Sequence, residues 1–209
     1  MTRRQIPQVS SRKEPQQTRS TELVAAILQA AVQVLAREGA SRFTTARVAE
    51  KAGVSVGSVY QYFPNKAAIL FRLQSDEWEQ TTQMLRAILR DTGRPPLDRL
   101  RELVHAFIRS ECEEAGMRVA LSDAAPLYRD APEAKAVKTS SEKLYLDFIR
   151  EVLPDAVPRT RTLATRLITQ TLSAVGKDFS ESPRTPAEIR AYADAMADMF
   201  SAYLKGLMS

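Results

Sequence analysis

Residues 43–66 read FTTARVAEKAGVSVGSVYQYFPNK and contain two predicted helices with a turn between them. Thr44 or Thr45 can cap the first helix through its hydroxyl, and apolar residues then recur at helical spacing. Gly53 supplies the permissive backbone that a tight turn needs, and Ser55 can cap the second helix. Two short helices joined by a glycine-containing turn are the sequence form of a helix-turn-helix.

The second predicted helix, residues 56–63, has few apolar residues, and Pro64 stops it because the residue before a proline is pushed out of the α region. Val59 and Phe63 lie four positions apart and share one face, so they can anchor the helix. We expect its other side chains to point outward, where hydroxyls, an amide and phenols can hydrogen-bond phosphates and base edges. Gly57 adds no side chain, so the backbone can approach a duplex closely.

The run GVSVGSVYQYFPNK, residues 53–66, resembles the DNA-binding signature of the TetR family of bacterial transcriptional regulators. The resemblance implies that Tyr60 and Lys66 hold phosphates. It also implies that four residues lie near the groove: Thr45, Val56, Ser58 and Tyr62. Val56 stands where the family often has a polar residue, so base reading there would be an apolar contact, as with a thymine methyl. The predicted DNA-binding residues are Thr44, Thr45, Arg47, Ser55, Val56, Gly57, Ser58, Tyr60, Gln61, Tyr62 and Lys66.

Positive charge is concentrated in the same part of the chain. Residues 1–66 hold ten Lys or Arg and four Asp or Glu, a net charge of +6, whereas the whole chain carries +5. This asymmetry indicates a phosphate-binding module on a nearly neutral body. A solvated basic terminus is the alternative interpretation.

The composition favours helices throughout the chain. Together with the points below, it also predicts a cytoplasmic protein. The 209 residues include seven Gly and one Cys, Cys112, so no internal disulfide framework is predicted. No window approaches the roughly 18 consecutive apolar residues of a membrane span, and residues 1–20 lack the apolar segment of a secretory signal.

Three regions are predicted along the chain. Residues 1–19 hold two prolines and four glutamines and are expected to be a flexible basic tail. The basic residues of this tail can contact the DNA backbone or minor groove, or they can provide only non-specific charge screening. They are Arg3, Arg4, Arg12, Lys13 and Arg19. Residues 20–66 form the helix-turn-helix domain, and residues 67–209 form a helical ligand-binding and dimerisation domain.

The predicted fold is all-α with about nine helices. A first helix ends at Gly39, which acts as a C-cap. A long helix over residues 66–91 spans about 37 Å and can act as a lever between two sites. Further helices are predicted over residues 97–114, 117–124, 132–152, 160–179 and 186–207.

The last two predicted helices each carry an apolar stripe. Such stripes suit helix-on-helix packing, either inside the protomer or across a twofold dimer interface. Spacing leaves both possibilities open, and the family resemblance implies the homodimer. The predicted interface residues are Leu163, Leu167, Thr171, Val175, Met196, Phe200, Tyr203 and Leu207.

No catalytic constellation is predicted, and no cofactor or metal. His105 is the only histidine and reads as a core or interface residue, and the glutamates around Cys112 read as a solvated face. We therefore expect no enzyme. A helical small-molecule-binding protein, with DNA contact secondary, is the alternative to a regulator.

The resemblance also implies a small-molecule effector whose binding makes the protein dissociate from its DNA operator. A ligand shifts such an equilibrium only by preferring one conformation, and the helix over residues 66–91 is the expected moving element. Plain core is the alternative interpretation of each candidate pocket residue, and the one that residue type alone favours. The candidates are Trp78, Met84, His105, Phe107, Met117, Tyr128, Tyr145, Phe148 and Gln170.

Overall fold

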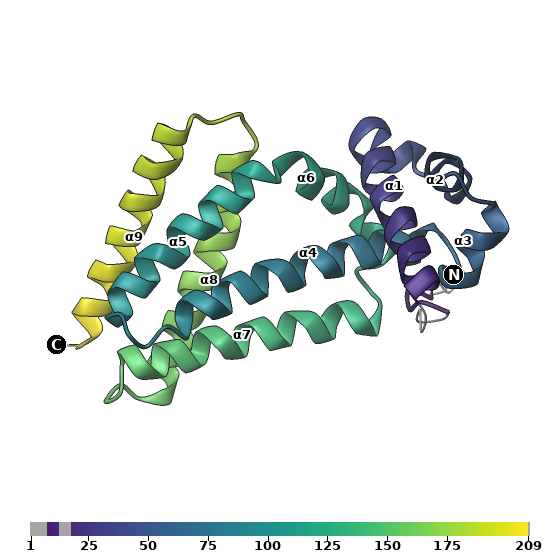
Figure 1. The fold of residues 1–209 in the computed structure, drawn as a ribbon. Coiled ribbons are helices and arrows are strands. Elements are labelled where there is room, and N and C mark those ends of the chain that lie inside the picture. The colour runs from purple at the N-terminus through teal and green to yellow at the C-terminus, as the bar shows by residue number, and fades with distance from the viewer. Residues whose placement is uncertain (1–7, 13–17, 209) are drawn as a thin grey trace, which may run out of the picture. The chain divides into compact units, whose positions relative to one another are not determined.

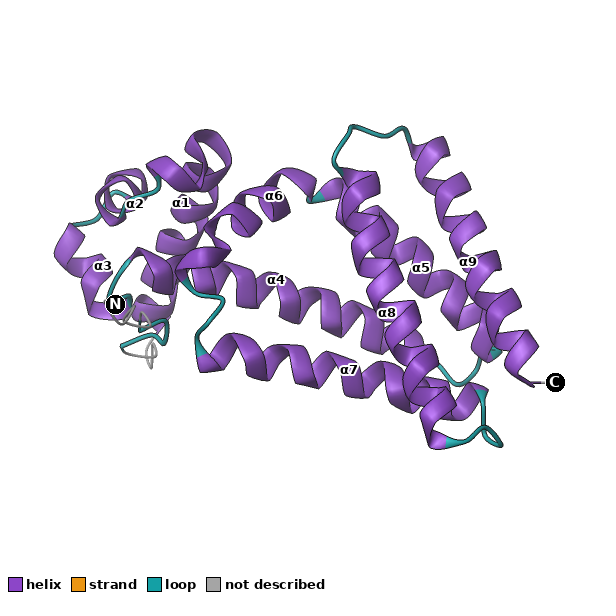
Figure 2. Ribbon diagram, turned by 180° about the vertical axis from the view of Figure 1, so that it is seen from behind, coloured by secondary structure: helices purple, strands orange, loops and turns teal. Residues whose placement is uncertain are grey.

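The computed structural model of the chain describes residues 8–12 and 18–208, except for the side chains of residues 134–142. Every regular element in this described part is a helix (Figure 1, Figure 2). The elements are α1 (Thr18–Arg42), α2 (Thr45–Ala52), α3 (Val56–Tyr62), α4 (Lys66–Leu89), α5 (Pro96–Glu113), α6 (Ala115–Ala124), the 3-10 helix η1 (Ala125–Leu127), α7 (Pro132–Val152), α8 (Pro158–Ser180) and α9 (Pro186–Met208). The all-α prediction is confirmed.

The chain divides into two compact units. The first comprises Met1–Trp78 and Gly116–Val137, and the second comprises Glu79–Ala115 and Lys138–Ser209. The predicted domain boundary after residue 66 does not coincide with this division, because α4 runs on without a break past that point. The later segment joins the first unit through Tyr128, which is 2% exposed. Its ring centroid lies 5.9 Å from that of Phe71 in α4, and its hydroxyl lies 3.2 Å from Gln74 Oε1.

The first unit is built around the apolar face of α1. Ile27 and Leu35 on this face are fully buried, as is Phe43 in the short link to α2. The two helices of the predicted helix-turn-helix contribute Val48 and Val59 to the same cluster. These side chains form the expected three-helix core.

Two glycines end helices in this unit. Gly39 has φ 72° and breaks the helical path of α1 at the predicted C-cap. Gly53, with φ 69°, ends α2: its N–H donates to Glu50 O at 3.1 Å, and the N–H of Val54 donates to Ala49 O at 3.0 Å. This pair of bonds is a Schellman motif. A side chain at Gly53 would cost roughly 1–2 kcal/mol in this left-handed conformation.

The second unit packs α5 against α8 and α9, as Figure 1 shows. Its buried cluster includes Leu103 and Ile108 of α5 and Leu172 of α8. At Gly176 of α8, an added Cβ would lie 2.9 Å from the ring of Phe107, so the two helices approach closely there.

Arg99 is an unusual member of the second core. Its side chain is 1% exposed, pairs with Glu151 and donates to the carbonyl oxygens of Leu89 and Arg94. The guanidinium also lies 5.5 Å from the ring centroid of Phe148. A buried charge needs such partners, so Arg99 joins the end of α4, the α4–α5 link and α7 within this unit.

One described helix, α1, is long and apolar enough to cross a membrane by length and composition. One of its faces, which includes Ile27 and Leu35, lies in the core of the first unit. Core helices of globular proteins pass the same test, so this is a weak indication of a membrane span.

Candidate nucleic-acid interface

Hydroxyl caps begin both helices of the helix-turn-helix. Thr44 Oγ1 accepts from the N–H of Arg47 at 3.3 Å, so Thr44 rather than Thr45 caps α2. Ser55 Oγ accepts from the N–H of Ser58 at 3.0 Å and lies 2.8 Å from Ser58 Oγ. Such caps contribute about 1 kcal/mol each.

Three buried side chains hold α3 against the first unit. Val59 and Phe63 are 0% and 1% exposed, which agrees with their predicted anchoring role. Tyr62 is also buried, at 6% exposed, so the prediction that its phenol points outward is wrong. Positions 59, 62 and 63 lie on one helical face, which explains why Tyr62 turns inward with the other two.

The opposite face of α3 is open to solvent. Val56 and Tyr60, one helical turn apart, are 39% and 41% exposed. Gly57 and Gln61 lie beside them and are exposed as well. Lys66, half-buried, is the first residue of α4. These residues provide an apolar contact, a phenol, an amide and an ammonium, in agreement with the predicted character of the surface.

Two predicted DNA-binding residues of α2 are engaged inside the protomer. Thr45 is 7% exposed, so its side chain belongs to the interior and the prediction that it faces a groove is wrong. Arg47 forms an ion pair with Glu38 of α1, although its side chain is 43% exposed. An exposed pair of this kind contributes at most about 1 kcal/mol, so the guanidinium can exchange partners at little cost.

The segment before α1 was expected to be flexible, yet residues 8–12 are packed. Val9 is 3% exposed within the core cluster of the first unit. Asn65 Nδ2 donates to Gln8 O at 3.0 Å, and the N–H of Arg12 donates to Tyr62 O at 2.8 Å. The lone apolar Val9 in a polar stretch was the available sequence signal. Arg3, Arg4 and Lys13 lie outside the described residues, and Arg19 is exposed in the first turn of α1.

Comparison with known proteins agrees with this geometry. Residues 27–73 match the model described as bacterial regulatory proteins, tetR family, and residues 95–207, more than half of the chain, match the tetracyclin repressor-like C-terminal domain. The chain belongs to the TetR family. This is a family of bacterial regulatory proteins, and the matched N-terminal part contains the helix-turn-helix.

Individual relatives of this TetR-family regulator match over part of their length. The nucleoid occlusion factor SlmA of Vibrio campbellii is 34% identical over 105 residues, 50% of this chain and 53% of SlmA. The regulator TtgR of Pseudomonas putida is 33% identical over 94 residues, 45% of this chain and 42% of TtgR. This chain therefore spans about half the length of these curated relatives.

A solved structure shares the TetR-family fold over most of the chain. NalD of Pseudomonas aeruginosa superposes with a TM-score of 0.63 at 20% identity, covering 88% of this chain and 96% of NalD. At this identity the likeness shows the fold alone.

Most of the predicted effector-pocket residues of this TetR-family chain are buried in a hydrophobic core or pack against one. Trp78, Met117 and Tyr128 pack in the first unit, whereas Met84, Phe107, Tyr145 and Phe148 pack in the second. Burial raises the pKa of Tyr145, whose phenol therefore stays protonated.

Two other predicted pocket residues lie elsewhere. His105 Nε2 is 3.0 Å from Asp194 Oδ1, which places it against α9. Gln170 is exposed on α8. The prediction that Gln170 lines a pocket is wrong for the protomer, because its face of α8 points to solvent.

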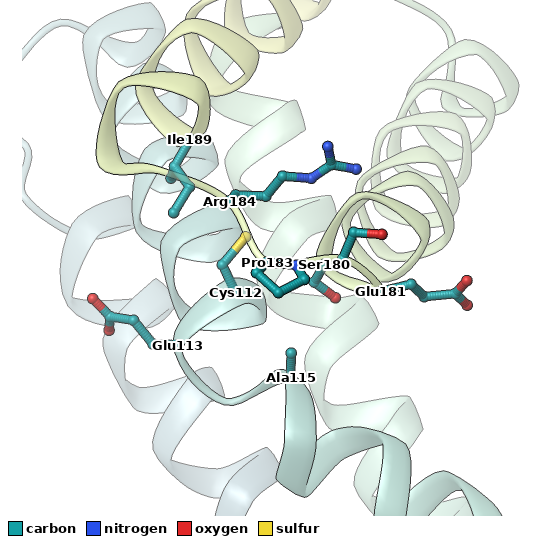
Figure 3. A pocket seen from close by; sticks show the side chains of 9 residues that line it. Cys112, Glu113, Ala115, Ser180, Glu181, Pro183, Arg184 and Ile189 are labelled. Carbon is teal, nitrogen blue, oxygen red and sulfur yellow. The ribbon is translucent and has the colours of Figure 1, made fainter.

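A cavity of about 430 Å³ opens in the second unit, at the turn between α8 and α9 (Figure 3). Cys112 and Arg184 face it, whereas the carboxylates of Glu113 and Glu181 point away from Cys112. Burial raises the pKa of the Cys112 thiol, and Arg184 opposes that shift. None of the predicted pocket residues lines this cavity, because the sequence pattern did not reveal the turn formed by residues 181–184.

The predicted dimer stripes differ in exposure. Leu163 and Leu167 of α8 are 61% and 46% exposed, whereas Thr171 and Val175 are half-buried. On α9, Tyr203 and Leu207 are half-buried and pack against the second core.

Met196 and Phe200 do not lie on an open face of α9. They are 6% and 3% exposed within the protomer's own core, so the prediction that they form a dimer surface is wrong. Met199, which was not predicted, is 51% exposed on α9. The stripe through residues 196 and 200 packs inside the protomer, and an adjacent face is left open.

The contrast between the two tyrosines of α3 gives a direct test. Tyr62→Ala removes a buried ring and is expected to lower the free energy of unfolding by about 3–5 kcal/mol. Tyr60→Phe removes only an exposed hydroxyl and should change it by less than about 0.5 kcal/mol. Urea denaturation measures both. A larger loss for Tyr60→Phe than for Tyr62→Ala would contradict the assignment of the two faces.

Proposed function

We propose that this TetR-family regulator is a repressor that binds a pseudo-palindromic DNA operator as a homodimer and is released by a small-molecule effector. The observation that carries the proposal is α3, whose apolar side is buried while its polar side is left open to solvent. Val59, Tyr62 and Phe63 anchor the helix, so the side chains on its other face are free to contact a partner. NalD, which shares this fold, is the secondary repressor of a multidrug efflux pump in Pseudomonas aeruginosa, and we propose the same direction of control here.

Each exposed group of α3 has a role in this proposal. Tyr60 and Lys66 hold phosphates, which positions the protein without reading sequence. Val56 and Gln61 reach base edges, Val56 through an apolar contact and Gln61 through its amide. Ser58 contributes less directly, since its hydroxyl is already hydrogen-bonded to Ser55. The net charge of +6 on residues 1–66 favours the approach of DNA.

Lys66→Ala tests DNA binding. The protein is expected to retard a duplex taken from upstream of its own gene in a gel-shift assay. The plot of log affinity against log salt has a negative slope, and its steepness should fall by about 0.9 for each phosphate contact that is lost. The exposed Lys143→Ala in α7 is the matched control and should leave the slope unchanged. Equal slopes for Lys66→Ala and wild type would remove Lys66 from the interface.

We further propose that the dimer forms through α8 and α9. Leu163, Leu167 and Met199 are large apolar side chains exposed on these two helices. Both helices pack against α5, and exposed large apolar side chains on such helices can form an interaction surface. A twofold axis through this surface would join two copies and present two α3 helices to half-sites about 34–36 Å apart.

The double substitution Leu163→Glu with Leu167→Glu is expected to yield a monomer in light-scattering chromatography, because four carboxylates would be buried unpaired in each dimer. Operator affinity should fall at least tenfold as the second half-site is lost. Val119→Glu, which changes an equally apolar exposed residue of α6, should stay dimeric. A double variant that still runs as a dimer would place the interface elsewhere.

The effector is proposed to bind in the second unit among Met84, Phe107, Tyr145 and Phe148, which offer apolar walls with a polar handle. Binding would favour one placement of α4, whose 24 residues span about 36 Å. Because operator half-sites tolerate little misfit, a shift of α4 would weaken binding.

The effector model is tested with a compound that stays with the protein during purification. Native mass spectrometry should reveal the bound mass, and adding the extracted compound should weaken operator binding at least tenfold. A compound that occupies the protein fully and leaves operator affinity unchanged would reject the release mechanism. That result would favour a small-molecule-binding protein for which DNA contact is secondary.

We propose that the protein acts by binding and not by catalysis, and that it needs no cofactor. Its partners are double-stranded DNA, a small molecule and a second copy of the chain, and its location is the cytoplasm.

A further inference from the structure

A short segment before α1 is built into the first unit. We call residues Gln8–Arg12 the N-terminal strap. Val9 of the strap is 3% exposed and belongs to the core cluster that contains Val59 and Phe63. Burying a valine side chain contributes about 1.5 kcal/mol or more. Hydrophobic burial therefore fixes the middle of the strap.

Asn65 fastens the strap to the start of α4. Its Nδ2 donates to Gln8 O at 3.0 Å, while its Oδ1 accepts from the N–H of Ala68 at 2.9 Å. The second bond is an N-cap of α4, and the first ties the strap to that cap. One amide thus serves two segments more than fifty residues apart.

Arg12 fastens the other end of the strap to α3. Its backbone N–H donates to Tyr62 O at 2.8 Å, and its Nη1 lies 3.4 Å from Tyr60 O. The last carbonyls of a helix have no partner within the helix and carry partial negative charge. The Arg12 guanidinium is therefore held at the C-terminal end of the recognition helix, beside exposed Tyr60.

We propose that the N-terminal strap presents Arg12 as a DNA phosphate contact at the C-terminal end of α3, with Val9 and Asn65 as positioning residues. This inference rests on the proposed DNA binding by α3. A guanidinium has five donors, and among the described residues the side chain of Arg12 makes one long hydrogen bond, to Tyr60 O. Because the strap is already docked, the contact forms without the ordering cost that a free arm incurs.

The first experiment measures the salt dependence of binding to a 30-base-pair duplex from the protein's own upstream region and to an unrelated duplex of equal length. Arg12→Gln is expected to lower the slope of log affinity against log salt by about 0.9 per contact on both duplexes. Its thermal unfolding midpoint should match the wild type, because the backbone bond to Tyr62 O is kept. Arg159→Gln, an equal charge change at an exposed site of α8, should not change the slope. An unchanged slope for Arg12→Gln would overturn the proposal.

The second experiment asks whether Asn65 acts through Arg12. Asn65→Ser replaces the amide with a hydroxyl, which can still cap α4 but cannot reproduce the amide donor to Gln8 O. It is expected to weaken DNA binding severalfold in the wild-type background and to have little further effect in the Arg12→Gln background. Such non-additivity is the signature of two residues acting on one contact. Fully additive losses would show that Asn65 acts only through the fold, and would overturn its positioning role.

The two proposals fail in different ways. If the wild-type protein binds neither duplex, DNA binding by α3 is wrong and the inference about Arg12 falls with it. If the wild type binds and Lys66→Ala lowers the slope while Arg12→Gln does not, only the inference about the strap is wrong. Val9→Ser provides an independent check, since undocking the strap should weaken binding while Arg12 is still present.

Discussion

The recognition helix α3 has only seven residues, and this length is the main constraint on the first unit. Isolated helices shorter than about 12–15 residues are marginal in water, so α3 depends on its tertiary contacts. Val59, Tyr62 and Phe63 provide them by burying almost completely. On so short a helix, each side chain either anchors the helix or is exposed. The exposed side chains are therefore the ones that a partner can contact.

Local signals made much of this predictable. The caps, the glycine turn and Pro64 each act within a few residues, so the bounds of α2 and α3 follow closely from the sequence. Tyr62 was misassigned because its hydroxyl suggested a surface role, although its spacing from Val59 already placed it on the anchored face. For an amphipathic side chain such as tyrosine, helical spacing was the better guide than polarity.

Packing between distant segments could not be predicted in the same way. The strap contacts residues about fifty positions away, and its polar composition is typical of a disordered tail. On α9, the stripe containing Met196 and Phe200 fits an intrachain core and a dimer interface equally well by spacing. Its burial in the second core, where α9 packs against α5, assigns it to the core. Leu163, Leu167 and Met199 are left exposed instead.

The strap also joins the two elements on which regulation would act. Its bonds end on the last turn of α3 and, through Asn65, on the first turn of α4. A displacement of α4 at this point must stretch either the cap to Ala68 or the bond to Gln8. Each such bond contributes about 1 kcal/mol, and 1.4 kcal/mol is a tenfold change in an equilibrium. A small movement of α4 can therefore change how firmly Arg12 is held, without any change in the residues of α3 itself.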